Sequence, residues 1–325
     1  MKRACRNIDR FEGPRLLSSM ASTAGESITP GYATSARPGV WLTDLSLVFV
    51  AFVWGVNFSI VKFGTTLVDP LAYNGVRIAL AAVVLAIIVA VSRVPLPPRA
   101  TILALLGLGV LGNGVYQFLF VEGIAHTRAS DAALVVAASP AFIAMIGRAK
   151  GVERISRRGA IGIVLSMAGI ALVVFGTSRG TAGRASLLGD TLVLVGSLAW
   201  AIYTVLLKPH THRVPGMQLS AFTMIGGALA LLVVASPSIV HAPWASMPLA
   251  GWASIFFSGM LALVIAYYFW YRGVRIIGPT RTAMFSNLQP LFAVAMAWAM
   301  LGERPTIWQG VGAITIMTGL ILTRT

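Results

Sequence analysis

Apolar stretches about 20 residues long recur along the chain from residue 40 onward, and each could span the hydrocarbon core of a bilayer as one helix. Short breaks rich in Pro, Gly and charged residues separate them. We count ten stretches: 44–64, 71–91, 101–121, 129–147, 159–177, 187–207, 218–236, 249–271, 280–301 and 306–323. The pattern predicts an all-α integral membrane protein with ten transmembrane helices.

The composition excludes the soluble alternatives. Of the 325 residues, 57% are hydrophobic and 11% are charged, whereas a soluble domain carries about a quarter charged residues. The mean hydropathy of +0.83 is too high for a chain with a wetted surface. A soluble enzyme, a disordered chain and a disulfide scaffold are therefore excluded, and the single cysteine, Cys5, also excludes an internal disulfide.

The net charge of +15 is spread singly or in short runs between the apolar stretches. Because no run forms a continuous basic face with interleaved aromatic residues, we expect no nucleic-acid partner. If the N-terminus lies inside, 19 Lys and Arg residues fall on the inner side of the membrane and 6 on the outer side. This bias predicts that both termini are cytoplasmic.

The segment 1–40 is polar and rich in Arg, Ser, Gly and Pro, without the apolar core of a cleavable signal peptide. We expect a disordered cytoplasmic tail there. Met20 offers a second start, so residues 1–19 could be a mis-assigned extension.

The two halves of the chain resemble each other. A shift of 146 residues aligns WGVNFSIVK at 54–62 with WAIYTVLLK at 200–208 without a gap. A shift of 150 residues aligns Pro140 with Pro290 and the Glu153-Arg154 pair with its counterpart at 303–304. We therefore expect two five-helix repeats, 41–178 and 186–323. Because five is odd, the second enters the membrane inverted, which creates a central crevice suited to alternating access.

These segments give the chain a resemblance to the drug/metabolite transporter superfamily in its EamA-type ten-helix form. The resemblance covers residues 41–323 and rests on WGVNFSIVK, Ser139-Pro140, Gln289-Pro290 and the LGER run at 301–304. The first half departs from it, with KGVER at 150–154 where LGER is usual. The resemblance implies a secondary transporter that exports amino acids or similar small metabolites across a bacterial inner membrane. A homodimer is left open.

A literal GxGxxG pattern occurs at Gly107, Gly109 and Gly112. It lies inside a continuous apolar stretch instead of between a strand and a helix, so we interpret it as close helix packing by small residues and not as a dinucleotide site. Walker A, HExxH and Cys/His metal-binding patterns are absent from the sequence. We expect no cofactor, no metal and no enzymatic activity.

Polar and aromatic side chains at mid-span are the candidate substrate-binding residues. An amide that faces lipid would leave its hydrogen-bonding groups unsatisfied, so these residues should face the interior. They could line a cavity or simply tie helices together, and the aromatic run that contains Tyr267 could instead form an interfacial belt. The set is Trp54, Asn57, Asn113, Tyr116, Gln117, Trp200, Tyr203, Tyr267 and Asn287.

Two further groups complete the candidates. Pro140 and Pro290 lie at matched positions in the fourth and ninth stretches, where they form hinges or static kinks. Glu122 is the acid nearest a span interior and, with His126, is the candidate for coupling transport to protons. We place both near the outer ends of the first four stretches together with Lys62, Arg77 and Arg128. These side chains either snorkel to the headgroups or form a vestibule for zwitterions.

Two functions of other classes remain open at this stage. A membrane enzyme would need a catalytic constellation in the crevice. A non-transporting sensor or assembly factor would keep the fold without a polar cavity.

Overall fold

The computed structural model describes residues 40–150, 156–178, 183–211, 213–277, 282 and 285–324. All of them belong to one unit, Pro38–Thr325. The predicted tail over 1–40 lies outside these residues except for its last position, and so does the Glu153-Arg154 pair.

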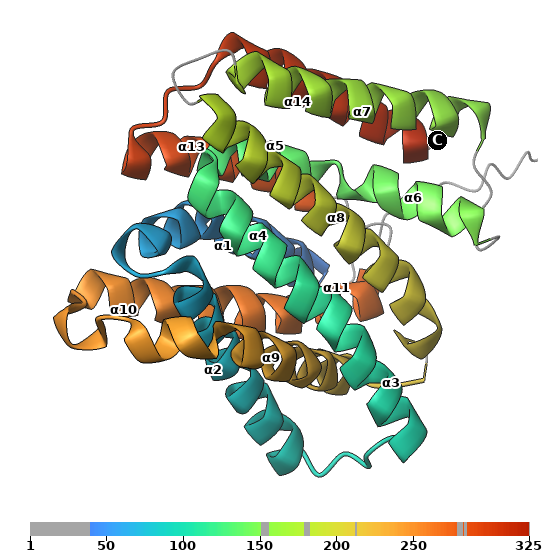
Figure 1. Cartoon of the computed structure of the whole chain (residues 1–325). Coiled ribbons are helices and arrows are strands. Elements are labelled where there is room, and N and C mark those ends of the chain that lie inside the picture. The colour runs from blue at the N-terminus through green and yellow to red at the C-terminus, as the bar shows by residue number, and fades with distance from the viewer. Residues whose placement is uncertain are drawn as a thin grey trace, which may run out of the picture. The chain divides into compact units, whose positions relative to one another are not determined.

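Every regular element in the described part of the chain is a helix (Figure 1). The first half contains α1 (Val40–Leu67), α2 (Pro70–Val91), α3 (Arg99–Gly109), η1 (Val110–Val115), α4 (Tyr116–His126), α5 (Ala129–Ala137), α6 (Ser139–Ala149) and α7 (Arg157–Ser178). The second half contains α8 (Gly183–Thr211), α9 (Gly216–His241), η2 (Trp244–Ser246), α10 (Leu249–Phe256), η3 (Phe257–Ile265), α11 (Ala266–Ile277), η4 (Ser286–Leu288), α13 (Gln289–Leu301) and α14 (Ile307–Arg324).

Eight helical stretches of the described residues are long and apolar enough to cross a membrane. They match the first eight predicted spans, with ends that differ by a few residues: Trp41–Leu67, Pro70–Val91, Arg99–His126, Ala129–Ala149, Arg157–Phe175, Leu187–Thr211, Gly216–His241 and Leu249–Gly273. At the predicted ninth and tenth spans lie α13, which has 13 residues, and α14, which has 18. The prediction of an all-helical membrane protein is confirmed.

Three of these stretches are interrupted where the sequence predicts continuous α-helices. The third contains the π-helical segment η1, and the eighth contains the π-helical segment η3. The fourth breaks at Ala138 between α5 and α6. A π-helical turn holds more residues than an α-turn, so side chains on either side of it change their angular position.

Helices from the two halves pack against each other. α7 lies along α14, α2 along α9, and α4 along α8, while α1 packs against α13 and α11 (Figure 1). The main core cluster accordingly draws side chains from both halves, among them Phe58, Phe120, Phe142 and Ile316.

Glycines let helix backbones touch at the interface of α3 and η1 with α9. Gly109 lies against the backbone of Thr223, and Gly226 lies against the backbone of Leu106. A Cβ atom on either glycine would overlap a backbone carbonyl of the other helix. Such close approach is how small residues drive helix association in lipid.

The GxGxxG pattern therefore packs helices, as predicted. Gly109 meets α9, and Gly112 lies directly against the ring of Tyr203. Gly107 has no atom near the position where its Cβ would be. At Gly109 and Gly112 there is thus no room for a side chain, whereas at Gly107 there is.

This difference gives a paired test. Gly109→Ala should destabilise the protein by about 2 kcal/mol, because an overpacked contact forces the two helices apart. Gly107→Ala should be neutral or stabilising by about 0.5–1 kcal/mol, since alanine favours a helix over glycine. Thermal unfolding of the purified variants in detergent measures both, and an equal loss of stability in the two variants would contradict this packing.

Candidate functional site

Predicted site residues from both halves meet in a first aromatic group. The ring of Trp54 on α1 lies 5.7 Å from that of Tyr267 and 5.2 Å from that of Trp270, both on α11. The indole Nε1–H of Trp54 donates a hydrogen bond of 2.9 Å to the carbonyl of Ala262. Trp54 thereby ties the first helical stretch to the eighth.

A second aromatic group joins α4 to α8. The ring centre of Trp200 lies 5.1 Å from that of Tyr116 and 5.1 Å from that of Tyr203. Tyr116 also contacts Phe120, with ring centres 5.5 Å apart. Offset and tilted aromatic pairs of this kind give flat, rigid apolar walls.

The aromatic run in the first half of α11 points its side chains in two directions. Tyr268 is 49% exposed, as expected of a residue in an interfacial belt. Tyr267 and Trp270 instead pack against Trp54. Tyr267 is therefore an interior residue and not a belt residue.

Two predicted amides are buried with an unused acceptor. Asn57 is 7% exposed and Asn113 is 3% exposed, and the Oδ1 atom of each has no hydrogen-bond donor among the described residues. A buried acceptor without a partner costs about 1–3 kcal/mol, so each can accept a hydrogen from a ligand. Asn287 lies in η4 and is partly buried.

The predicted common face of Asn113, Tyr116 and Gln117 divides in the structure. Asn113 lies within η1, next to α9, and Tyr116 faces α8. Gln117 faces α2, where its Oε1 atom accepts a hydrogen bond from Arg77. The π-helical turn is the reason, because the prediction assumed regular α-helical spacing.

Arg77 is the residue whose depth the sequence analysis predicts wrongly. It is 0% exposed and lies in the interior, not at the headgroups. Its Nε–H donates to Asn74 Oδ1 at 3.0 Å, Nη1 to Ser258 Oγ at 2.5 Å, and Nη2 to Gln117 Oε1 at 2.5 Å. The position of Gln117 at mid-span was the available signal, since a buried amide needs a polar partner.

The charge of Arg77 links the two aromatic groups. Its partner Gln117 follows Tyr116 on α4, and its partner Ser258 lies in η3, directly before the helix that carries Tyr267. Tyr116 belongs to the second group and Tyr267 to the first. The candidate site is therefore a buried cation with two aromatic walls, each built from both halves of the chain.

Two other cationic side chains, which the sequence analysis placed at the outer ends of the spans, donate hydrogen bonds to backbone carbonyls at the ends of other helices or loops. Lys62 Nζ donates 2.9 Å hydrogen bonds to the carbonyls of Ile124 and Ala125, in the last turn of α4. Arg128 Nη2 donates to the carbonyl of Arg304 at 2.7 Å. Each satisfies backbone carbonyls that a helix end or loop leaves free.

Glu303 caps the start of α5 across the two halves. Its carboxylate accepts hydrogen bonds from the N–H groups of Ala129 and Ser130, at 2.9 and 3.1 Å, and from Ser130 Oγ at 2.6 Å. The Nε atom of Arg128 lies 3.8 Å from the same carboxylate. We call this arrangement the Glu303 clamp, and through it the LGER run caps a helix of the first half.

Two acids beneath the clamp are fully buried. Thr127 Oγ1 donates to Asp190 Oδ1 at 2.6 Å, and Gln309 Nε2 donates to Asp131 Oδ1 at 2.7 Å. Gln309 Nε2 also reaches Ser130 Oγ at 2.8 Å. The acids lie near span ends, yet they are enclosed by protein instead of water.

Glu122 is partly buried on α4, and His126 is exposed one turn later. The Nδ1 atom of His126 lies 2.8 Å from the carbonyl oxygen of Glu122.

Pro140 lies in the first turn of α6 and Pro290 in the first turn of α13, where proline costs no helix hydrogen bond.

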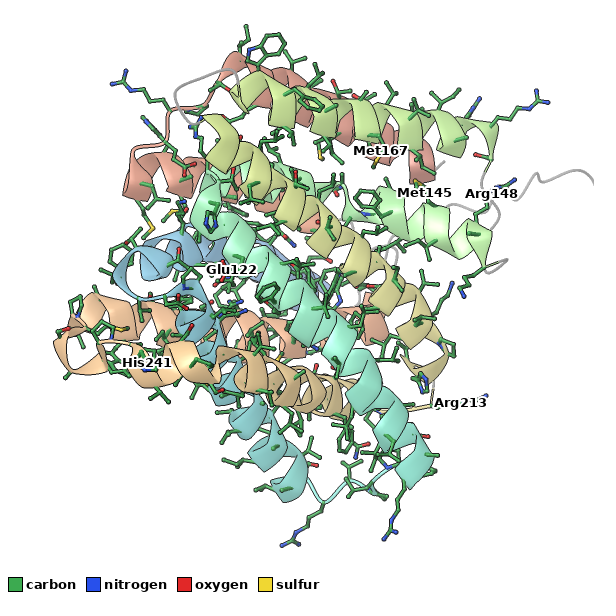
Figure 2. All side chains as sticks on the ribbon, in the orientation of Figure 1. Glu122, Met145, Arg148, Met167, Arg213 and His241 are labelled. Carbon is green, nitrogen blue, oxygen red and sulfur yellow. The ribbon has the colours of Figure 1, made fainter. Side chains whose placement is uncertain are left out.

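A cavity of about 400 Å³ lies between α6 and α7. It is lined by Met145, Arg148, Ser156, Arg157, Ala160 and Ile163. It contains no predicted site residue, and Figure 2 places Met145 and Arg148 well away from Glu122. The aromatic groups around Arg77 thus remain the candidate site.

The sequence profile of the EamA-like transporter family matches the chain twice, over residues 41–175 and 187–325. The chain belongs to this family. Relatives of this EamA-like protein include an "Uncharacterized transporter YyaM" of Bacillus subtilis, which is 25% identical over 82% of this chain and 88% of the relative.

Two further relatives of the EamA-like chain carry names that state a substrate. A "Probable amino-acid metabolite efflux pump" of Escherichia coli is 28% identical over 84% of this chain and 91% of the relative. A "Probable terminal-alkyne amino-acid exporter" of Streptantibioticus cattleyicolor is 26% identical over 85% and 91%, respectively. One solved structure, titled "Crystal structure of protein", has a TM-score of 0.59 at 17% identity and covers 87% of this chain and 96% of its own. That likeness concerns the fold alone.

Proposed function

We propose that the EamA-like chain is a secondary transporter that exports amino acids or similar small metabolites by alternating access. The observation that carries the proposal is the site itself: a buried cation between aromatic walls that come from both halves of the chain. A crevice between two related halves can open first to one side of the membrane and then to the other.

Contacts between α7 and α14 support an inverted repeat of five plus five helices. Gly319 lies against Gly162, and Gly312 lies against Gly169. The shift of 150 residues relates Gly162 to Gly312 and Gly169 to Gly319. The shift therefore exchanges the two contacts, which supports a two-fold relation between the halves.

A second exchanged pair supports the same relation at different helices. Gly123 meets Val193 between α4 and α8, and Gly273 meets Leu47 between α11 and α1. Gly123 and Gly273 are 150 residues apart, and Leu47 and Val193 are 146 residues apart. The repeat thus maps one contact onto the other.

We propose the boundaries 41–178 and 186–323 for the two repeats, with α13 and α14 as the ninth and tenth helices. The double match of the family profile supports this division. We also propose a bacterial inner membrane with both termini cytoplasmic, which the bias of 19 against 6 basic residues supports.

Three features favour amino acids as substrates. The names of two relatives refer to amino-acid export. The unused Oδ1 acceptors of Asn57 and Asn113 could satisfy the donors of a substrate ammonium group. The aromatic walls suit a partly apolar side chain better than a polyanion.

Counterflow in proteoliposomes tests the proposal. Vesicles loaded with an unlabelled amino acid should take up the same labelled amino acid faster with the protein than without it. The twenty standard amino acids are tested singly, and the absence of counterflow for all of them would refute amino-acid transport. The same assay separates a transporter from a membrane enzyme or sensor, because neither would move label.

A matched tyrosine pair tests the site. Tyr116→Ala removes the ring that links Trp200 to the neighbourhood of Arg77, and we expect counterflow to fall at least tenfold with normal expression. Tyr268→Ala removes a tyrosine that is exposed on α11 and should leave the rate within twofold. Similar rates for the two variants would place the substrate elsewhere.

A further inference from the structure

Arg77 lies well inside α2. It is the eighth of the 22 residues of that helix, so it lies about 10 Å along the axis from the helix start, at 1.5 Å per residue. A charge at that depth is costly in a bilayer unless it has a partner. Within the described residues Arg77 forms no ion pair, and its hydrogen-bond acceptors are neutral: Asn74, Ser258 and Gln117.

The guanidinium retains unused donors. It has five N–H groups, and three of them are engaged. One N–H group on each terminal nitrogen, Nη1 and Nη2, therefore has no acceptor among the residues that the structure describes. Two adjacent terminal N–H groups match the two oxygens of a carboxylate.

The fold itself does not need a cation at this place. Helices α2 and α9 begin at residues 70 and 216, 146 positions apart, as the repeat requires. The same shift takes Arg77 to Thr223 and Asn74 to Ser220. Thr223 is buried and donates to the carbonyl of Leu219 at 2.8 Å, so the second half builds the equivalent helix without a charge.

We propose that Arg77 binds the carboxylate of the transported molecule. The inference rests on the proposed function and deepens it, since it names the group by which the substrate is recognised. The three neutral acceptors hold the guanidinium in place, and the carboxylate supplies the missing counter-charge. Tyr116 adjoins the partner Gln117, and Tyr267 lies on the helix that follows the partner Ser258, so residues from opposite halves would enclose the substrate body.

A single fork of two free N–H groups suits one monoanion. A phosphate dianion carries twice the charge and more oxygens than one guanidinium can satisfy, so a phosphorylated metabolite would leave buried charge uncompensated. The guanidinium is closed off in this structure. A substrate must therefore reach it when the two halves reorient, as alternating access requires.

Binding to the purified full-length protein tests the inference directly. The twenty amino acids and inorganic phosphate are titrated while tryptophan fluorescence is recorded. The best-binding amino acid is then compared with its carboxamide and with the amine that lacks the carboxylate. In the wild type we expect both analogues to bind about 30-fold more weakly, which is the loss of a charge-assisted hydrogen bond of about 2 kcal/mol.

The variant Arg77→Gln should remove this preference, so that the acid and its amide bind within threefold of each other. Arg77→Lys keeps the charge without the fork and should retain a reduced preference, which also covers the case that Arg77→Gln does not fold. Arg99→Gln removes an exposed cation at the start of α3 and should behave as the wild type. Equal binding of acid and amide to the wild type, a preference that survives in Arg77→Gln, or binding of phosphate alone would each overturn the inference.

Counterflow of the same compounds separates the two proposals. Selective binding of the carboxylate without counterflow would refute the transport function and leave Arg77 as a carboxylate-binding residue. Counterflow that carries the amide as fast as the acid would support transport and refute the role of Arg77.

Discussion

Replacing Glu303 with alanine should lower the free energy of unfolding by about 3 kcal/mol, because the Glu303 clamp provides several charge-assisted hydrogen bonds. The variant would leave the N–H groups of Ala129 and Ser130 without their acceptors at the start of α5. It would also leave Arg128 without its carboxylate. The lost contacts join the loop before α14 to the first half, so the two halves should separate more easily.

Two neighbouring variants serve as controls. Arg304→Ala alters an exposed side chain whose backbone carbonyl, and not its guanidinium, is used by Arg128, so it should have little effect. Glu303→Gln keeps one oxygen as an acceptor and should fall between the two. Unfolding by detergent titration measures all three, and a loss in Arg304→Ala as large as that in Glu303→Ala would contradict the clamp.

Counterflow should proceed at equal pH on the two sides of the vesicle, and any acceleration by a pH gradient should vanish in Glu122→Gln. The reason is the placement of the acids. Glu122 is partly buried within a membrane-spanning stretch and its helix lies beside the candidate site, whereas Asp131 and Asp190 are each held by a hydrogen bond beneath the clamp. A proton carrier must exchange its proton with both sides.

The same vesicles with Asp190→Asn complete the experiment. This variant should keep whatever response to the pH gradient the wild type has. An absolute requirement for a gradient that Glu122→Gln leaves intact would contradict the prediction. If Asp190→Asn alone removed that requirement, the coupling site would belong to the buried acids.

The helices could be predicted from the sequence because lipid imposes a length and an apolar composition on each span. The first eight stretches were found within a few residues of their ends. What local patterns could not show were the π-helical segments η1 and η3, which depend on packing against other helices. The divided face of Asn113, Tyr116 and Gln117 follows from the first of them.

The aromatic residues of the site could be predicted from the sequence, but the buried charge of Arg77 could not. Trp54 and Trp200 stand out as a matched pair in the repeat, and both lie in aromatic groups that combine the two halves. The sequence places Arg77 near the outer end of its span, where it either snorkels to the headgroups or joins a vestibule for zwitterions. Its partners Gln117 and Ser258 are 40 and 181 residues away, so only the folded chain brings them together.

The unpaired Arg77 charge also bears on electrical insulation. At an effective dielectric constant of about 20, a monovalent cation about 4 Å from the guanidinium is disfavoured by about 4 kcal/mol, or roughly a thousandfold in occupancy. Sodium, potassium and hydronium ions would meet this barrier at every reorientation of the two halves. The residue that binds the carboxylate of the substrate thus also keeps cations from leaking through the carrier down the ion gradients of an energised membrane.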